Sequence, residues 1–176
     1  MGGVAKGLLP LAGRPMLDHV IGRFAPQVGA LALNCNADLA CALPVLPDPR
    51  PDRPGPLAGV LAALIWAEGL GAARVATVPW DAPCLPLDLV ARLAVTPGAA
   101  MAASLADGQL HPEPVFAVWP VTARGALQDW LDTGQHRVAG FAQSLGAVLV
   151  PFDAAGFFNV NTPDDLSRAE AMFHAL

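Results

Sequence analysis

The sequence predicts an α/β fold built on a mostly parallel sheet. Segments in which apolar residues recur at helical spacing alternate with short apolar runs that are typical of buried strands, and polar residues follow several of those runs. The chain has 176 residues, of which 54% are hydrophobic and only 14% are charged. This length and composition predict one domain, residues 1–176, with a substantial core.

The first half of the chain contains a regular succession of predicted elements. A helix follows Pro15, because apolar residues recur at helical spacing through residues 17–24. Apolar runs predict strands at residues 29–33, 45–46 and 75–78. Helices are expected at residues 38–43, 57–68 and 86–93, the last of which has a proline in its first turn. A loop with four prolines, residues 49–56, precedes the second of these helices.

The second half of the chain is less regular but continues the alternation. Strands are predicted at residues 99–104, 115–119 and 147–150, and helices at residues 123–131 and 137–145. The last helix begins at the string Thr-Pro-Asp-Asp, residues 162–165, where Thr162 suits the cap, a proline fills the first position and two acids face the positive end of the helix dipole. No internal repeat and no linker divides the chain, which supports the prediction of a single domain.

Charge and cysteine content exclude several classes of function. A net charge of −5 and a pI of about 5.1 argue against a nucleic-acid partner, which would call for a basic face. Glycines, prolines and charges interrupt every apolar run, so no membrane span is expected. The three cysteines, Cys35, Cys41 and Cys84, lack C-x-x-C spacing and are expected to be buried, reduced thiols of a cytoplasmic protein. The four histidines form no H-x-x-x-H pair, which argues against a transition-metal site.

Polar side chains follow the predicted strands in a way that indicates a ligand site. In open α/β sheets, ligands bind at the carboxyl ends of the strands. Residues of this kind are Asn34 and Asn36 after one strand, Asp48 after the next, Asp81 after the third, and Asn159 and Asn161 after a later apolar piece. The sequence therefore predicts that these residues gather along one edge of the sheet.

Lys6 is the only lysine of the chain and lies among glycines, in the string Met-Gly-Gly-Val-Ala-Lys-Gly that opens the sequence. Glycines such as Gly3 allow backbone N–H groups to approach an anion, and a lone ammonium adds a compact positive charge, so this string suits a phosphate. The string does not match a P-loop, and the alternative that Lys6 is an ordinary surface lysine stays open.

Three further positions have both a functional and a structural interpretation. Asp81, in Val-Pro-Trp-Asp-Ala-Pro, can hold Mg²⁺ against nucleotide phosphates or can simply stabilise a turn. Asp48 can accept hydrogen bonds from a base or a sugar, or can be a solvated loop acid. Gly59 ends the string Pro-Gly-Pro-Leu-Ala-Gly at the start of a predicted helix. A glycine there lets the backbone approach a base, but the string is also typical of an ordinary proline-rich loop.

The most distinctive string is Phe-Phe-Asn-Val-Asn-Thr-Pro-Asp-Asp-Leu, residues 157–166. Asn159 and Asn161 are separated by one residue and would lie on the same side of an extended segment. Their amide groups offer donors and acceptors that suit a polar heterocycle, and capping of the last helix by Thr162 does not exclude this role. Arg137 is a weaker candidate, because a solvated arginine at the start of a helix would serve equally well.

Taken together, these strings resemble the molybdenum cofactor guanylyltransferases, which have the nucleotidyltransferase fold that is also used for sugar nucleotides. The matching strings run in family order over the whole chain: M-G-G-V-A-K-G-L-L-P-L-A-G-R-P, N-C-N, P-D, P-G-P-L-A-G-V-L, V-P-W-D-A-P, the H-P-E-P region, H-R-V and F-F-N-V-N-T-P-D-D-L. The resemblance implies a three-layer, Rossmann-like fold. It also implies a reaction in which GMP moves from GTP to the terminal phosphate of molybdopterin and pyrophosphate is released.

The resemblance further implies a role for each candidate residue. Lys6 and Gly3 would contact the phosphates, and Asp81 would hold Mg²⁺, the implied cofactor. Asn34, Asp48 and Gly59 would face the nucleoside, while Asn159, Asn161 and Arg137 would face the pterin. The implied partners are GTP, molybdopterin, and a molybdoenzyme or its chaperone that receives the product, with no nucleic acid and no membrane.

The chain departs from the family pattern at its start. The family begins with an apolar strand and an L-A-G-G-x-S-x-R-M-G-G loop around the triphosphate, whereas this sequence begins at the Met of R-M-G-G. We therefore expect the native chain to start upstream of Met1, by roughly 15–20 residues. Without that first strand, the neighbouring strand edges would be exposed and the sheet weakened. Ala5 also replaces the Asp that is common in the family, which would loosen the loop beside Lys6.

Two alternatives to the guanylyltransferase stay open at this point. One is a cytidylyltransferase for the same cofactor or for another small phosphate, on the same fold. The other is a non-catalytic remnant or binding protein, which keeps the pterin side and lacks the triphosphate loop.

Overall fold

The main sheet has four strands, in the order β5-β7-β6-β8. The computed structural model describes residues 7–38, 41–50 and 55–174. The strands are β5 (Arg74–Thr77), β6 (Ala100–Ala106), β7 (Gln109–Pro120) and β8 (Val148–Asp153). β7 pairs antiparallel with both β5 and β6, and β6 pairs parallel with β8, so β5, β6 and β8 all run in one direction. The predicted α/β class is confirmed, and only β7 runs against the common direction of this sheet.

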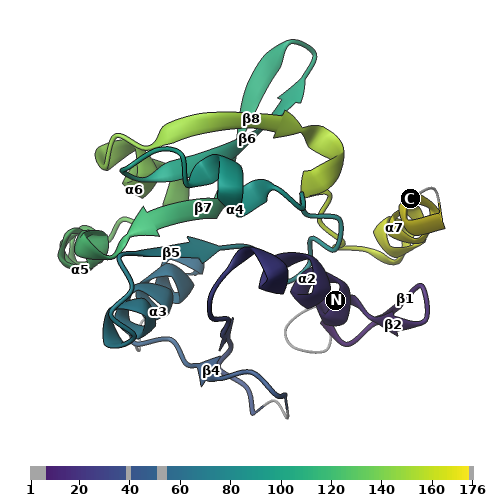
Figure 1. The fold of residues 1–176 in the computed structure, drawn as a ribbon, viewed down its shortest axis with the longest axis horizontal. Helices are drawn as coiled ribbons and strands as arrows, with labels where there is room; N and C mark the ends of the chain where they lie inside the picture. Colours follow the sequence, from purple (N-terminus) through teal and green to yellow (C-terminus); the bar gives the residue numbers. More distant parts are fainter. Residues whose placement is uncertain (1–6, 39–40, 51–54, 175–176) are drawn as a thin grey trace.

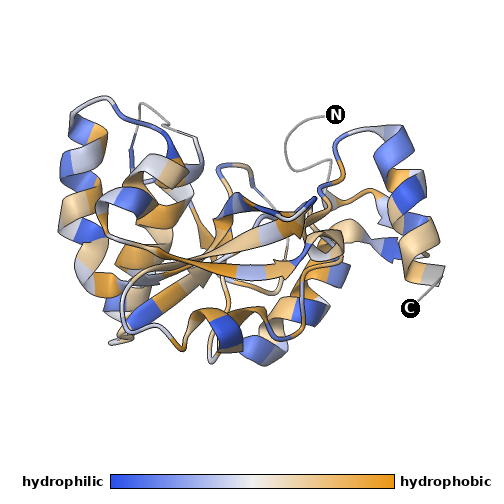
Figure 2. Cartoon of the chain, turned by 90° about the horizontal axis from the view of Figure 1, so that it is seen from above, coloured by the Kyte–Doolittle hydropathy of each residue, from blue (hydrophilic) through white to orange (hydrophobic). Residues whose placement is uncertain are grey.

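Helices cover both faces of the main sheet and make three layers (Figure 1). Ala117 and Trp119 of β7 face one side, whereas Phe116 and Val118 face the other, as strand alternation requires. The first side packs against α3 (Pro56–Gly69), α5 (Arg124–Asp132) and α6 (Val138–Ser144). The second side packs against α2 (Met16–Phe24), α4 (Leu89–Leu93) and the short helix η3 (Ala154–Phe157). Figure 2 shows hydrophobic residues along the central strands between these layers. No helix among the described residues has both the length and the apolarity needed to cross a membrane.

Two small two-stranded sheets flank the main one. β3 (Leu33–Asn34) pairs parallel with β4 (Val45–Leu46), and β1 (Pro10–Leu11) pairs antiparallel with β2 (Arg14–Pro15). The β1–β2 hairpin lies beside α7 (Pro163–His174) in Figure 1. A third buried cluster joins them, made of Leu11, Met16, Val160 and Ala169. The remaining elements are the short helices η1 (Ala25–Gln27) and η2 (Val121–Ala123).

A cavity of about 780 Å³ separates the β3–β4 pair from the main sheet. Its walls include residues 32–34 around β3, residues 74–78 of β5 and its end, and Val118 of β7. Within the described residues, β5 is an edge strand of the main sheet and pairs with β7 alone.

The β6–β7 hairpin is longer than the sequence analysis predicted, and it projects beyond the body of the molecule in Figure 1. Its tip is the dipeptide Asp107-Gly108, with φ angles of 51° and 74°, and Ala106 pairs with Gln109 directly across it. Positive φ at both central residues is the geometry of a two-residue hairpin turn, for which Asp-Gly is a strong signal. That dipeptide was available in the sequence and would have predicted the hairpin.

Two predictions were wrong, one about a helix before β4 and one about the burial of the cysteines. No helix forms in the described part of residues 38–43, where residues 38 and 41–43 are bends and loop. A six-residue segment is too short to nucleate a helix alone, and Pro44 disfavours helical backbone at Leu43. The cysteines are free, but only Cys84 is buried, whereas Cys35 is half-buried and Cys41 is exposed. Burial raises the pKa of the Cys84 thiol, and Arg23 opposes this shift to a lesser extent.

Candidate functional site

The parallel register of β3 and β4 brings Asn34 and Asp48 together. Asn34 lies opposite Leu46, so the loops that leave the two carboxyl ends run side by side. The Asn34 amide Nδ2 donates to the Leu46 carbonyl and to Oδ1 of Asp48, both at 2.9 Å. The predicted gathering of these two residues at one sheet edge is confirmed, although their role in binding stays a prediction.

Asn36 makes two hydrogen bonds to Asp48, whereas Asn34 makes one; the sequence places Asn36 at the predicted ligand edge but assigns it no individual role. Its Nδ2 donates to Oδ2 of Asp48 at 2.7 Å, and its Oδ1 accepts from the backbone N–H of Asp48 at 2.8 Å. The signal was present in the sequence, because the N-x-N spacing that places Asn159 and Asn161 on one side applies equally to Asn34 and Asn36.

Gly59, in the first turns of α3, makes room for the side chain of Asn34. A Cβ atom at Gly59 would lie 2.5 Å from Oδ1 of Asn34, closer than real Cβ contacts allow. The amide oxygen of Asn34 is thus one neighbour that requires a glycine here, and the close approach of Gly59 to a base stays a prediction.

Asp81 lies in the loop after β5, and its side chain is half-buried. Its backbone carbonyl accepts a hydrogen bond from the N–H of Val160 at 2.9 Å. Gly7 approaches the same loop, since a Cβ at Gly7 would lie 2.8 Å from the indole ring of Trp80. The loop that carries Asp81 therefore meets both the start of the described chain and the string that contains the two asparagines. Lys6 and Gly3 themselves lie outside the described residues.

Asn159 and Asn161 flank a buried residue in a segment that is neither helix nor strand. Val160 is 0% exposed and belongs to the third cluster, whereas Asn161 is exposed and Asn159 is half-buried. Oδ1 of Asn159 is buried without a hydrogen-bond partner in the described structure, which is unusual for an amide oxygen. A buried acceptor of this kind suits a donor group on a ligand.

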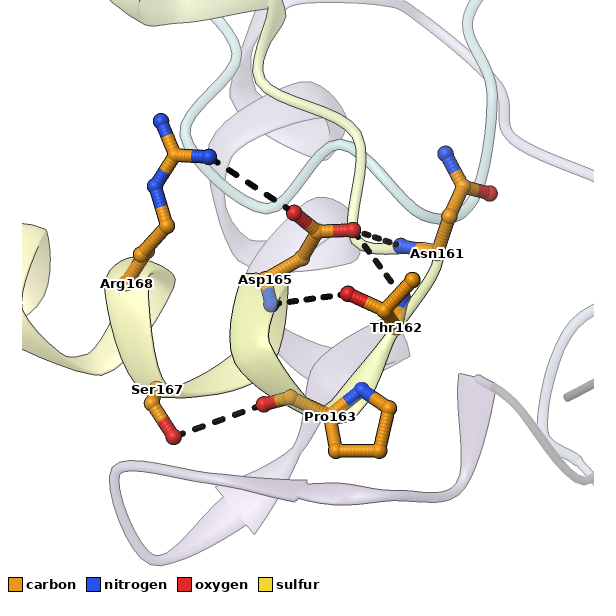
Figure 3. A network of polar contacts seen from close by, with 6 residues as sticks. All are labelled: Asn161, Thr162, Pro163, Asp165, Ser167 and Arg168. Atoms are coloured by element: carbon orange, nitrogen blue, oxygen red, sulfur yellow. Dashed lines mark hydrogen bonds and ion pairs between the residues drawn. The ribbon is translucent and has the colours of Figure 1, made fainter.

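The start of α7 is capped as the sequence predicts (Figure 3). The backbone N–H of Asp165 donates to Oγ1 of Thr162 at 3.1 Å, and Oδ2 of Asp165 accepts from the backbone N–H groups of Thr162 and Asn161 at 2.9 and 3.0 Å. These bonds, led by the one from Asn161, hold the pKa of Asp165 below its usual value. The cap uses only the backbone of Asn161, and its amide group points away from the cap in Figure 3.

Some of the candidate residues line one common cavity, and others do not. Asn34, Gly59 and Asp81 line the cavity between the two sheets, so two nucleoside-side candidates and the phosphate-side candidate border one volume, whereas Asp48 does not line it. Most of the lining residues are apolar, and Asn34 and Asp81 are among the few polar ones. Arg137 is exposed and stands immediately before α6, so its place in the site remains a prediction.

The carboxylate of Asp81 fits a magnesium ion that is held mainly by substrate. In the described residues, no group of three or more His, Cys, Asp or Glu side chains could hold a metal by itself. Mg²⁺ in nucleotide enzymes is commonly bound by one or two carboxylates together with substrate phosphates and water. A single half-buried carboxylate at the end of a strand is consistent with that arrangement.

Comparison with known proteins identifies the family. The profile of the MobA-like NTP transferase domain matches residues 1–148. A molybdenum cofactor guanylyltransferase from Cereibacter sphaeroides is 44% identical over 98% of this chain and 90% of its own. The chain belongs to the MobA-like NTP transferase family. A second MobA-like relative, the molybdenum cofactor guanylyltransferase from Acidiphilium cryptum, is 45% identical over 97% of this chain and 88% of its own. The resemblance drawn from the motifs is thus confirmed, and the family is one of nucleotidyltransferases.

Solved structures support the nucleotidyltransferase fold of this MobA-like chain. Molybdopterin-guanine dinucleotide biosynthesis protein A from Archaeoglobus fulgidus superimposes with a TM-score of 0.75, at 22% identity over 97% of this chain and 91% of that one. The 2-C-methyl-D-erythritol 4-phosphate cytidylyltransferase from Thermus thermophilus gives a TM-score of 0.73, at 20% identity over 97% of this chain and 94% of that one. At this identity, the two structures establish the fold alone.

Proposed function

We propose that the chain transfers GMP from GTP to the terminal phosphate of molybdopterin and releases pyrophosphate. The relatives that match nearly the whole chain are named for this activity. The structural observation that carries the proposal is the hydrogen bond from the N–H of Val160 to the carbonyl of Asp81. It brings the loop of the phosphate-side candidate next to the string of the pterin-side candidates, and transfer between two bound substrates needs their sites to be adjacent.

The nucleoside of GTP would lie against the loops after β3 and β4. Asp48 is half-buried, and each of its carboxylate oxygens receives one amide N–H, from Asn34 or from Asn36. A carboxylate offers about four lone-pair positions, so acceptor capacity remains for donors on the ribose or the base. Gly59 would support this site indirectly, because its missing side chain leaves Asn34 in place to hold Asp48.

The triphosphate would lie near the loop of Asp81. Asp81 would hold Mg²⁺, which supplies charge neutralisation at the phosphate oxygens when it is bound. Gly7 contacts Trp80 beside Asp81, and Lys6 immediately precedes Gly7 in the chain. Lys6 and Gly3 lie outside the described residues, and the family resemblance assigns them to the phosphates, where the ammonium would balance negative charge that develops during transfer.

Molybdopterin would bind next to the string of residues 157–162. Asn159 offers a buried amide oxygen that has no hydrogen-bond partner among the described residues, and it could accept from an N–H group of a pterin ring. Asn161 would offer a second amide to the same substrate, and Arg137 would meet its anionic part. These three assignments rest on the family resemblance together with the placement of the two asparagines.

The chemical step needs no covalent enzyme intermediate. A terminal phosphate oxygen of molybdopterin would attack the α-phosphorus of GTP, and the bond from that phosphorus to the bridging oxygen toward the β-phosphate would break. A new diphosphate linkage forms, and the electron pair of the broken bond leaves with pyrophosphate. The residues of the chain would hold the two substrates in line and balance their charge, which are the main sources of catalysis in such transfers.

A labelled-transfer assay tests the proposal directly. The protein is incubated with molybdopterin, Mg²⁺ and either labelled GTP or labelled CTP, and both the dinucleotide product and pyrophosphate are measured. We expect product from GTP, and we expect Asp81→Asn to lower its formation by about 100-fold or more. Asp107→Asn is the matched control, because it makes the same chemical change at the exposed tip of the β6–β7 hairpin.

The outcomes separate the candidate functions. Transfer from CTP alone would overturn the guanylyl assignment and favour a cytidylyltransferase. Binding of molybdopterin without transfer from either nucleotide would favour the non-catalytic alternative. Full activity of the Asp81→Asn variant would show that Asp81 has no part in the reaction.

A further inference from the structure

Asn36 is held to Asp48 by two hydrogen bonds that run in opposite directions. The amide nitrogen of Asn36 donates to the carboxylate of Asp48, and the amide oxygen of Asn36 accepts from the backbone N–H of Asp48. The first bond fixes the side chain of Asp48, and the second fixes its backbone. An amide can make both bonds, because it carries donors and an acceptor on one planar group.

The two asparagines together determine the orientation of the Asp48 carboxylate. Asn34 donates to Oδ1 and Asn36 donates to Oδ2, so each oxygen is held by one neutral donor. Both donors are neutral amides, so these hydrogen bonds add no positive charge beside the carboxylate. In the described residues, these two amides are the partners of the carboxylate, and the lone pairs that remain on both oxygens have a defined direction.

The position of this network argues against a purely structural role. Asn34 and Asn36 are both exposed, and Asp48 is half-buried, so the three side chains bury little apolar surface. Ordering three polar side chains costs conformational entropy, and hydrogen bonds that are largely exposed return little net stability. Such a network is better explained by the preorganisation of one carboxylate for a ligand.

We propose that Asn36 is a positioning residue, which orients the carboxylate of Asp48 toward donor groups on the nucleoside of the substrate. This inference rests on the proposed function, because it assumes that Asp48 faces the nucleoside. Asn36 would act through Asp48 and would not contact the reacting phosphate. Its loss should therefore weaken nucleotide binding and leave the chemical step nearly unchanged.

The test compares steady-state kinetics of the wild type, Asn36→Ala and Asn36→Asp, with GTP and molybdopterin varied separately. We expect Asn36→Ala to raise KM for GTP by about tenfold, with little change in kcat and in KM for molybdopterin. Gln128→Ala is the matched control, because it removes an exposed amide from α5 and should leave all three constants unchanged.

The Asn36→Asp variant adds a pH readout that a general loss of stability would not produce. Two ionised carboxylates at hydrogen-bond distance repel each other at neutral pH, and they would come to share a proton as the pH falls. We expect KM for GTP of this variant to be high at neutral pH and to fall toward the wild-type value on acidification. Thermal unfolding of each variant is measured in parallel. If Asn36→Ala folds poorly, the pH dependence of KM for Asn36→Asp still tests the inference.

A double variant distinguishes the hydrogen bond between residues 36 and 48 from the location of the carboxylate at residue 48. In Asn36→Asp combined with Asp48→Asn, the acceptor and donor exchange places, so the hydrogen bond can re-form, but the carboxylate no longer stands at residue 48. We expect thermal stability to recover while KM for GTP stays high. Wild-type kinetics for Asn36→Ala and for Asn36→Asp at every pH would overturn the inference. Absence of GTP use by the wild type would instead overturn the proposed function.

Discussion

Replacing Gly59 with alanine should damage nucleotide binding without unfolding the protein. The new Cβ would lie 2.5 Å from Oδ1 of Asn34, and real Cβ contacts are essentially never shorter than 3.0 Å, so the oxygen must retreat by at least 0.5 Å. The amide cannot move alone, because its nitrogen is bonded to the Leu46 carbonyl and to Asp48 at 2.9 Å. A shift of this size breaks or lengthens both bonds.

Gly59→Ala should change the stability of the protein little and its KM for GTP substantially. Alanine is favoured over glycine inside a helix by about 1 kcal/mol, and the loss of one or two exposed hydrogen bonds costs about the same. The free energy of unfolding should therefore change by no more than about 1 kcal/mol. The orientation of Asp48 depends on Asn34, so we expect KM for GTP to rise by about tenfold or more, which corresponds to about 1.4 kcal/mol.

The assay pairs urea unfolding with GTP kinetics for Gly59→Ala and for the control Gly22→Ala. Gly22 lies within α2, and a Cβ there would meet nothing within 4 Å, so the control gains helix propensity without a collision. We expect Gly22→Ala to be at least as stable as the wild type and to have unchanged KM. Wild-type KM for Gly59→Ala would refute the reasoning that connects Gly59, Asn34 and Asp48.

Two further predictions concern stability. Thr162→Ala removes the Oγ1 acceptor of the α7 cap and should lower the free energy of unfolding by about 1 kcal/mol in urea titrations, and an unchanged midpoint would contradict this. Glu113 accepts a hydrogen bond from Ser104 at 2.8 Å, and burial raises its pKa above the ordinary 4.5, against weaker opposing effects of Ser104 and His111. A raised folded-state pKa gives stability that is present below pH 4.5 and is lost as the pH rises through the folded-state pKa. As the pH rises from 4.5 through that pKa, the wild type should therefore lose stability relative to Glu113→Gln. Parallel curves of stability against pH for the two proteins would contradict this prediction.

The sequence anticipated the elements whose signals are local. The helices at α2, α3 and α5 and the cap of α7 were predicted nearly as they form, because apolar periodicity and capping residues act within a few positions of each other. The segment at residues 38–43 was predicted wrongly as a helix, because six residues carry too weak a local signal. The long β6–β7 hairpin was predicted only in part, although the sequence contains the Asp-Gly dipeptide that is typical of its turn.

The α/β class, the family and the residue types at the predicted sheet edge could all be read from the chain without coordinates. They follow from short-range periodicity and from strings such as that of residues 157–166, which need no knowledge of distance. Which of these residues meet was settled only in three dimensions. The parallel register of β3 and β4 makes Asn36 the closest partner of Asp48, and a helix from another layer brings Gly59 against Asn34. Such contacts depend on register and packing between segments that are distant in the chain, and no local pattern encodes them.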